Sequence, residues 1–418
     1  MRPMDGRGFP PLRLRSGPAL APEKRSEDGA RSVVAWKELP TEVRGFPGLK
    51  IGTWGTHILG RDQQVYRRYH LRVLLRRSPG KLELGSMTPD PDHQVAIVAI
   101  GRNEGDRLKS CLRAAVATAR TVVYVDSGSI DRSADFARSL GCHVVELPPP
   151  YSAARARNEG FAYAVRIDPD APIVQFVDGD CTLVQGWLEY GIEALNQRTD
   201  VGVVCGHVRE IHPEASVYNR LFDLEWRQGP GEINACGGIF MVRPAVFKAV
   251  GGFRDDVIAA EDNEFCVRVR RTGQKILLLD TAMVWHDAAM HRFIEWWRRT
   301  RRTGHAWAQV AALHGKSEER YFVRECRRVW LWGLAIPAIA ILFAPFTHGI
   351  SLFLFFLYGP QFGWIVRKGR KRGWPLGDSI VYAFFTVLSK FPAAGGMLAY
   401  YWRRWRGQTL TIMEHKES

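Results

Sequence analysis

The sequence predicts an α/β domain with a mostly parallel central sheet, followed by a helical region at a membrane. Two observations carry this prediction. Between residues 94 and 180, short apolar runs alternate with amphipathic stretches, which is typical of parallel strands joined by crossover helices. From residue 329 the composition shifts to long, nearly charge-free runs, which is typical of helices that enter a bilayer.

These shifts divide the 418 residues into four parts. Residues 1–31 are rich in Pro, Gly and Arg without periodicity, which predicts a disordered basic tail. Residues 32–93 form an N-terminal extension of unknown role. Within it, residues 66–77 form either an amphipathic basic helix at a membrane surface or a solvated helix packed on the main domain. The α/β domain then spans residues 94–315, and a membrane-associated helical region spans residues 316–418.

Charge and cysteine content narrow the class of protein. The chain has 58 Lys and Arg against 43 Asp and Glu, a net charge of +15, which suggests an anionic partner. Much of this charge lies beside the apolar runs, so lipid explains it better than nucleic acid, and we expect no nucleic-acid partner. The 7 cysteines are widely spaced with no CxxC, so neither a zinc cluster nor a disulfide framework is indicated, and this pattern fits a reducing compartment. The first thirty residues contain no apolar signal-peptide core.

The first half of the α/β domain follows a regular order. Buried-type strands are predicted at residues 94–100, 121–125, 143–146 and 173–177, with helices ending near residues 119, 140 and 165. Ser129 or Asp131 is expected to cap the second helix. Neither GxGxxG nor GxxxxGK[ST] occurs, so the common glycine-rich phosphate loops are not indicated.

Asp178 and Asp180 follow the fourth strand and are separated only by Gly179. Open α/β sheets bind ligands at the carboxyl edge of their strands. Two carboxylates at that edge suit a hard cation such as Mg²⁺ or Mn²⁺ that is shared with substrate phosphates. The alternative is a simple Asp-Gly turn, and the three residues alone slightly favour that alternative.

The pattern changes after Asp180. Strands are predicted at residues 202–209, 234–242 and 275–279, with helices at 246–250 and 260–271. Gly237 and Gly238 would let the backbone approach a ligand closely. Glu261 and Asp262 open the second helix, where the helix dipole also favours acidic residues for structural reasons alone.

The C-terminal region contains three apolar stretches. Residues 329–346 and 350–366 are each close to the ~20 residues that a spanning helix needs, and a short turn at residues 345–349 joins them. Basic clusters at both outer ends predict that both ends lie in the cytoplasm. The alternative is a buried hairpin in a soluble domain. Lys390 interrupts the third stretch, residues 380–401, which we therefore interpret as an interfacial or re-entrant helix.

The order of the polar motifs resembles that of family 2 glycosyltransferases, which have the nucleotide-sugar-binding GT-A fold. The resemblance covers residues 94–305, and the Asp-x-Asp alone would be weak evidence for it. The stronger signal is the series of matching segments, which are Arg102-Asn103-Glu104, the run from Asp126 to Asp131, Ala156-Arg157-Asn158, Asp178-Gly179-Asp180 and Glu261-Asp262.

The resemblance implies a role for each matching residue. Asp126 and Asp178 would contact the base and ribose, and Arg157 would help to hold that end. Asp180 would ligate the divalent cation, Mg²⁺ or Mn²⁺, and Asp262 would act as general base. His286 would either complete the metal shell or serve as a hydrogen-bonded structural histidine. The remaining expected site residues are Asn103 and Glu104 on the nucleotide side and Gly237, Gly238 and Glu261 in the sugar or acceptor pocket.

The resemblance therefore implies a metal-dependent, inverting transfer of a sugar from a nucleotide-diphosphate sugar. The acceptor would be lipid-linked or a growing surface polysaccharide at the cytoplasmic face of the inner membrane. Processive relatives carry a Gln- or Arg-x-x-Arg-Trp motif that residues 292–302 lack, so we expect transfer of a single sugar. The alternatives are a sugar transferase acting directly on polyprenyl phosphate and a catalytically silent membrane scaffold on the same fold.

Overall fold

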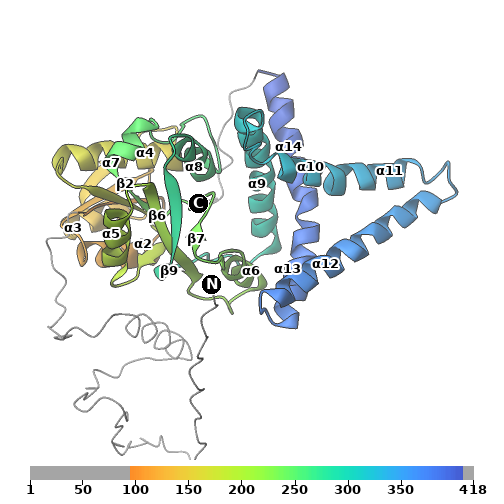
Figure 1. Ribbon diagram of the computed structural model, residues 1–418, viewed down its shortest axis with the longest axis horizontal. Helices are drawn as coiled ribbons and strands as arrows, with labels where there is room; N and C mark the ends of the chain where they lie inside the picture. Colours follow the sequence, from red (N-terminus) through yellow and green to blue (C-terminus); the bar gives the residue numbers. More distant parts are fainter. Residues whose placement is uncertain (1–94, 408–418) are drawn as a thin grey trace, which may run out of the picture. The chain divides into compact units, whose positions relative to one another are not determined.

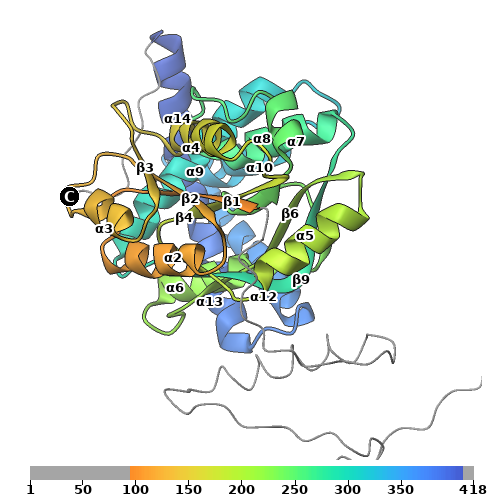
Figure 2. The ribbon, with the colours of Figure 1, turned by 90° about the vertical axis from the view of Figure 1, so that its left-hand side faces the viewer.

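The computed structural model describes residues 95–407 (Figures 1 and 2). The predicted tail at residues 1–31, the extension at 32–93 and the basic helix at 66–77 lie outside the described residues. The described residues belong to one compact unit.

The α/β part is built on a mixed sheet in the order β3-β2-β1-β4-β8-β6-β9-β5, with β7 paired to β9. The strands are β1 (Val95–Gly101), β2 (Thr121–Asp126), β3 (His143–Glu146), β4 (Ile173–Asp178), β5 (Cys181–Leu183), β6 (Val201–Glu210), β7 (Gly231–Glu232), β8 (Phe240–Val242) and β9 (Lys275–His286). The first four strands pair in parallel as predicted. The second half is not mostly parallel, because β8 runs antiparallel to both β4 and β6.

Helices cover both faces of this sheet. They are α2 (Asp106–Val116), α3 (Ser133–Ser139), α4 (Ala153–Ile167), α5 (Trp187–Gln197), α6 (Val217–Glu225), α7 (Pro244–Ala249) and α8 (Glu261–Arg271). In Figure 2, α4 and α8 lie on one side of the sheet and α2 and α5 on the other. Beneath α4 and α8, six phenylalanine rings pack, and the contacting pairs have centroids 4.1 to 6.1 Å apart. These rings belong to Phe161, Phe176, Phe240, Phe247, Phe253 and Phe265, of which Phe161 contacts Phe247 alone.

Two predicted strands have different bounds in the structure. Only Phe240–Val242 of the predicted strand 234–242 is extended and paired, because Gly237 has a positive φ of 73° and turns the chain. The strand predicted at 275–279 continues to His286. It continues because its last residues pair with β5 on one side and β6 on the other. As a result, His286 ends a central strand rather than lying beyond one.

The C-terminal helices form a second layer against the α/β domain. The long helix α9 (Phe293–His314) packs along α14 (Lys390–Trp405), and α13 (Leu376–Leu388) contacts α6 (Figure 1). Between them, α10 (Val323–Trp330) continues through a π-helical turn, Leu331–Ala335, into α11 (Ile336–Leu342). The chain then turns and returns through a 3-10 segment, Ile350–Leu357, into α12 (Tyr358–Lys371). The predicted apolar hairpin is therefore present, with α11 and α12 in its two arms (Figure 1).

By length and composition alone, two helices within residues 95–407 could cross a membrane. They are Ile350–Lys371 and Leu376–Trp405. The first contains the second arm of the predicted hairpin. The other contains residues 380–401, for which we expected an interfacial or re-entrant helix. This run is long enough to span because the helix resumes directly at Lys390, and one lysine does not offset the apolar residues around it.

Candidate active site

The predicted nucleotide-side residues meet at one edge of the sheet. Gly101 pairs with Asp126, and Ile100 pairs with Asp178, so the carboxyl ends of β1, β2 and β4 lie level with one another. Asp180 lies between β4 and β5, directly before the first residue of β5. The parallel register therefore brings together residues that lie far apart in the chain.

The turn after β2 is held by its own polar groups. The Asp126 carboxylate accepts hydrogen bonds from the backbone N–H groups of Gly128 and Ser129 at 3.1 and 2.8 Å. The Ser129 hydroxyl in turn accepts one from the Asn103 backbone N–H at 3.0 Å. The expected helix cap at Ser129 or Asp131 is wrong, because Arg132 occupies the N-cap position of α3 and its side chain makes no cap hydrogen bond. Asp131, one residue earlier, accepts the Ser133 backbone N–H at 3.1 Å. Asp126 and Asn103 thus shape this edge, and their contact with a nucleotide stays a prediction.

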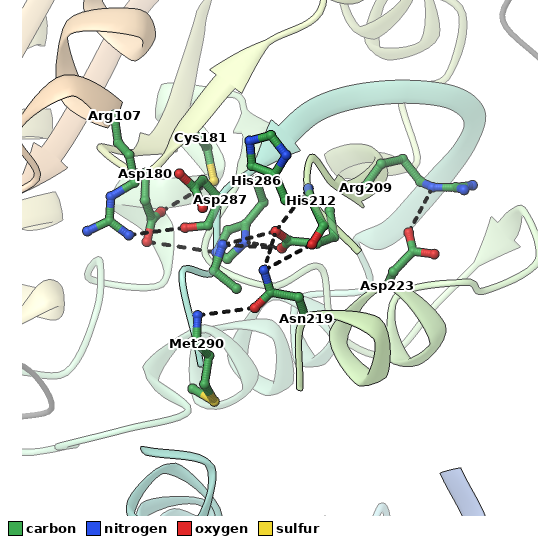
Figure 3. Close-up of polar contacts among 12 residues, drawn as sticks. Arg107, Asp180, Cys181, Arg209, His212, Asn219, Asp223, His286, Asp287 and Met290 are labelled. Carbon is green, nitrogen blue, oxygen red and sulfur yellow. Dashed lines mark hydrogen bonds and ion pairs between the residues drawn. The ribbon is translucent and has the colours of Figure 1, made fainter. Parts of the chain in front are cut away.

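Glu104 is connected to the backbone around Asp180 through Arg107. The Glu104 carboxylate and the Arg107 guanidinium form an ion pair at 2.7 Å. Arg107 also donates to the carbonyl oxygen of Asp287 at 3.1 Å, and the Asp287 backbone N–H donates to the carbonyl oxygen of Asp180 at 3.0 Å (Figure 3). Glu104 therefore supports the segment around Asp180.

Arg157 on α4 joins two distant carboxylates. Its guanidinium, 3% exposed, donates to Asp178 at 2.7 Å and to Glu261 at 2.8 Å. Burial lowers the pKa of Arg157, but the charges of these two carboxylates outweigh burial and raise it above its ordinary value. A Cβ on Gly238 would lie 2.2 Å from Nη2 of Arg157, so Gly238 allows the loop to pass this guanidinium. These contacts indicate that Arg157 positions Asp178 and Glu261, and its contact with a nucleotide stays a prediction.

Asp262 lies in the first turn of α8, next to Glu261. Burial and, after it, the charge of Glu261 raise the pKa of Asp262 to about 6, against the opposing charge of Arg157. The Asn263 side chain donates a hydrogen bond to its carboxylate at 3.0 Å. Ala260 precedes the helix with a positive φ of 56°, an uncommon conformation for a residue other than glycine that is often found at functional sites. A carboxylate with a pKa near 6 is suited to accept a proton near neutral pH.

Asp180 and His286 converge on one point. Nε2 of His286 lies 3.8 Å from Oδ2 of Asp180, and the Cys181 sulfur joins them in a group whose donor atoms lie within 4.8 Å of one another (Figure 3). Burial, reinforced by the Asp180 charge, raises the pKa of the Cys181 thiol well above its ordinary value, and sulfur is a soft donor that hard cations such as Mg²⁺ disfavour. The remaining donors, a carboxylate oxygen and an imidazole nitrogen, fit Mn²⁺ or Mg²⁺ with open positions for phosphate oxygens.

A cavity of about 360 Å³ opens beside this pair. Asp180 and His286 line one part of it. Phe222 and Trp226 from the α6 region contribute aromatic surface, and arginines of the α9 region contribute positive charge. The complete lining consists of Arg107, Asp180, Phe222, Trp226, His286, Ala288, Ala289, Met290, Arg292, Glu295, Arg298 and Arg299.

The sequence did not indicate two residues of this site, Cys181 and Glu210. Glu210 ends β6, and its buried carboxylate lies 3.2 Å from Nδ1 of His286. The sequence shows only that a charged residue, Glu210, directly follows the predicted strand 202–209. A surface turn would show the same pattern. Glu210 and His286 are 76 residues apart in the chain, so no local sequence pattern could predict their contact.

A sheet edge with these carboxylates, a donor pair for a hard cation and an arginine-lined cavity are typical of enzymes that act on phosphorylated substrates. Residues 96–251 match the family model described as Glycosyl transferase family 2. This match places residues 96–251, the first part of the α/β domain, in glycosyltransferase family 2.

Two curated relatives agree with this assignment. The glycosyltransferase AglE of Haloferax volcanii is 26% identical over 245 residues, which are 54% of this chain and 77% of that protein. The pre-mycofactocin glycosyltransferase of Mycobacterium tuberculosis is 29% identical over 243 residues. Those 243 residues are 54% of this chain and only 49% of the mycobacterial protein. The match thus spans about half the length of the mycobacterial relative.

A solved structure shares the fold over more of the chain. The mannosyltransferase PcManGT of Pyrobaculum calidifontis, in complex with GDP-Man and Mn²⁺, superposes with a TM-score of 0.52 at 17% sequence identity. The alignment covers 81% of this chain and 95% of that chain. The expected GT-A fold is confirmed, and the family match applies to residues 96–251.

Proposed function

We propose that this protein transfers one sugar, with inversion, from a nucleotide-diphosphate sugar to a lipid-linked acceptor at the cytoplasmic face of a membrane. The observation that carries the proposal is the convergence of Asp180 and His286 on a cavity whose other wall is rich in arginine. The GDP-Man and Mn²⁺ of the PcManGT complex agree with this class of donor and cation.

The donor end is assigned to the carboxyl edge of β1, β2 and β4. Asp126, Asp178, Asn103 and Glu104 surround this edge, and Arg157 keeps Asp178 in place. Asp180 and His286 would hold Mn²⁺ or Mg²⁺. When bound, such a cation neutralises the charge that develops on the leaving diphosphate. The loop with Gly237 and Gly238, together with Glu261, would border the sugar.

Asp262 is assigned as the general base. It takes the proton of the acceptor hydroxyl while the hydroxyl oxygen forms a bond to the anomeric carbon. The bond between that carbon and the diphosphate oxygen breaks, and its electron pair leaves with the diphosphate. A single displacement of this kind inverts the anomeric configuration. The raised pKa of Asp262 supports this assignment, because a stronger base holds the proton better.

The assignment of a lipid-linked acceptor is supported by the arginines that line the cavity and by the apolar helix next to them. Arg292, Arg298 and Arg299 line it and suit a phosphate-bearing acceptor. The same helix contacts α13, where the rings of Trp296 and Phe385 lie 4.9 Å apart, and α13 belongs to the apolar run Leu376–Trp405. An acceptor held in a bilayer could therefore present its phosphate to these arginines. Direct transfer onto polyprenyl phosphate is the second candidate, since the arginines favour it equally.

The orientation follows from the charges around the hairpin. Basic residues flank both of its outer ends and favour the cytoplasmic side. They are Arg324, Arg327, Arg328, Arg367, Lys368, Arg370, Lys371 and Arg372.

The metal-dependent donor site can be tested by a thermal-shift screen. Detergent-purified protein is melted with UDP-, GDP- and dTDP-sugars, with and without Mn²⁺ or Mg²⁺. We expect one nucleotide class to raise the melting temperature only when metal is present, because a ligand that binds the folded state stabilises it. Asp180→Ala should remove this shift, whereas Asp262→Asn should keep the shift and lose transfer.

Asp106→Ala serves as the control, because its carboxylate is 94% exposed on α2. It should shift as the wild type does. A metal-independent shift that survives Asp180→Ala would overturn the metal site, and near-normal turnover by Asp262→Asn would remove the general base.

A further inference from the structure

Glu210 is a buried carboxylate beside the proposed metal site. Its side chain is 0% exposed, and a buried charge is costly unless it is well hydrogen-bonded. It accepts the backbone N–H of Ala288 at 3.2 Å and that of His212 at 3.4 Å. The side-chain amide of Asn219 also donates to it at 3.3 Å. These neutral donors stabilise the ionised carboxylate in the protein interior.

The remaining close partner of Glu210 is Nδ1 of His286, at 3.2 Å. An ionised carboxylate can only accept a hydrogen bond, so Nδ1 of His286 must carry the proton. In neutral imidazole the lone pair then lies on Nε2. This is the nitrogen that lies 3.8 Å from Asp180.

The backbone around His286 holds the ring in place. His286 pairs with Cys181 in β5 and with Glu210 in β6. The edge of its ring also packs against Trp226, with centroids 4.6 Å apart. The ring can therefore turn little, and the position of its proton decides whether Nε2 can act as a ligand.

We propose, building on the metal site assigned above, that Glu210 is a positioning residue for His286. It holds the imidazole with the proton on Nδ1 and so presents the Nε2 lone pair to a divalent cation shared with Asp180. Carboxylates that orient metal-ligating histidines in this way typically contribute about 10- to 100-fold in metal affinity. Glu210 does not itself contact the substrate.

The chain contains a matched control in Glu264. This carboxylate is also 0% exposed and lies 2.9 Å from Nε2 of His314, and it forms a further ion pair with Arg268 at 2.7 Å. It joins α8 to α9, and no residue of the proposed metal group contacts it. Glu264→Gln therefore imitates the loss of a buried carboxylate–histidine pair away from the metal.

The test is a titration of the full-length protein in detergent with MnCl₂ alone, followed by the electron paramagnetic resonance signal of free Mn²⁺. We expect Glu210→Gln to weaken Mn²⁺ binding about 10- to 100-fold, and Glu264→Gln to bind as the wild type does. Equal affinity in Glu210→Gln and wild type would overturn the positioning role and leave the metal site intact. A wild type that binds no Mn²⁺ would instead overturn the metal site itself.

A second measurement does not depend on the variant folding. ¹⁵N spectra of wild-type protein labelled at histidine report which ring nitrogen carries the proton, and the loss of one signal in His286→Gln assigns it. We expect the Nδ1–H tautomer at His286. The Nε2–H tautomer would overturn the proposal whatever the variants show.

Discussion

At the scale of single residues, the environment decides what each carboxylate of the site can do. Burial raises the pKa of Asp178, but its ion pair with Arg157 at 2.7 Å opposes that rise and fixes the side chain in place. Asp262 accepts one hydrogen bond from its neighbour Asn263 and lies beside the like charge of Glu261. Pairs of carboxylates in contrasting environments commonly divide binding and proton transfer in this way.

The raised pKa of Asp262 predicts the pH dependence of catalysis. The base is active when deprotonated, and burial with the Glu261 charge raises its pKa from 3.8 to about 6. The logarithm of kcat/KM should therefore rise with unit slope below about pH 6 and level off above that pH. Steady-state rates measured across this range check the prediction.

The variant Glu261→Gln tests whether Asp262, rather than another titrating group, sets the midpoint of the pH profile. Removing the charge of Glu261 should move the midpoint to lower pH, because this charge is the second cause of the raised pKa. Glu264→Gln, further along the same helix, should leave the midpoint unchanged. A profile that is already flat at pH 5 would contradict the assignment of Asp262 as the titrating base.

At the scale of elements, close helix packing connects the catalytic domain to the C-terminal region. Two glycines make the contact between α9 and α14. A Cβ on Gly304 would lie 2.1 Å from the carbonyl oxygen of Ala393, and a Cβ on Gly396 would lie 1.9 Å from that of Arg301. Backbone atoms cannot move aside as side chains can, so these two positions set the separation of the helices.

This packing predicts opposite effects for neighbouring glycines of α14. Gly396→Ala should destabilise the protein, by roughly 1–3 kcal/mol as for other overpacked cores. Gly395→Ala meets nothing within 4 Å and should be neutral or stabilising by up to about 1 kcal/mol, because alanine favours helix. Thermal melting of both variants in the same detergent measures the difference. Equal melting temperatures would mean that α9 and α14 do not pack this closely.

At the scale of the whole molecule, the hairpin exposes a large apolar surface. Within residues 95–407, its turn carries Phe346 at 82% exposure and its returning arm carries Phe356 at 72%. Basic residues lie only at its base, in α10 and at the end of α12. An apolar tip with a basic base is the arrangement expected of a segment inserted into an anionic bilayer.

Charging two exposed phenylalanines of the hairpin should release the protein from membranes. The double variant Phe346→Asp and Phe356→Asp should lose most of its flotation with anionic phosphatidylglycerol vesicles. The reason is that a carboxylate at the centre of a bilayer costs about 2.5–3.5 kcal/mol on insertion scales. Ile130→Asp is the control, since Ile130 is 81% exposed but lies on the α/β domain. Flotation of the double variant at wild-type levels would exclude the hairpin as the anchor.

Local pattern predicted most of the fold and much of the candidate site. The strands ending at Gly101, Asp126 and Asp178 follow from short apolar runs, and their parallel order follows from the helices between them. The same order predicts that Asp126 and Asp178 share one edge. It does not predict the antiparallel strand β8, because Gly237 turns the chain where the apolar pattern suggests continuation.

The sequence by itself determined the strands β1 to β4 and their parallel direction, the carboxylates at their ends and the apolar hairpin. These features depend on residues close together in the chain, where periodicity and composition carry the information. Only the tertiary structure placed Glu210 against His286 and Arg157 between Asp178 and Glu261. Such contacts join residues up to 104 positions apart. They arise from the pairing of strands and the packing of helices, which no local pattern records.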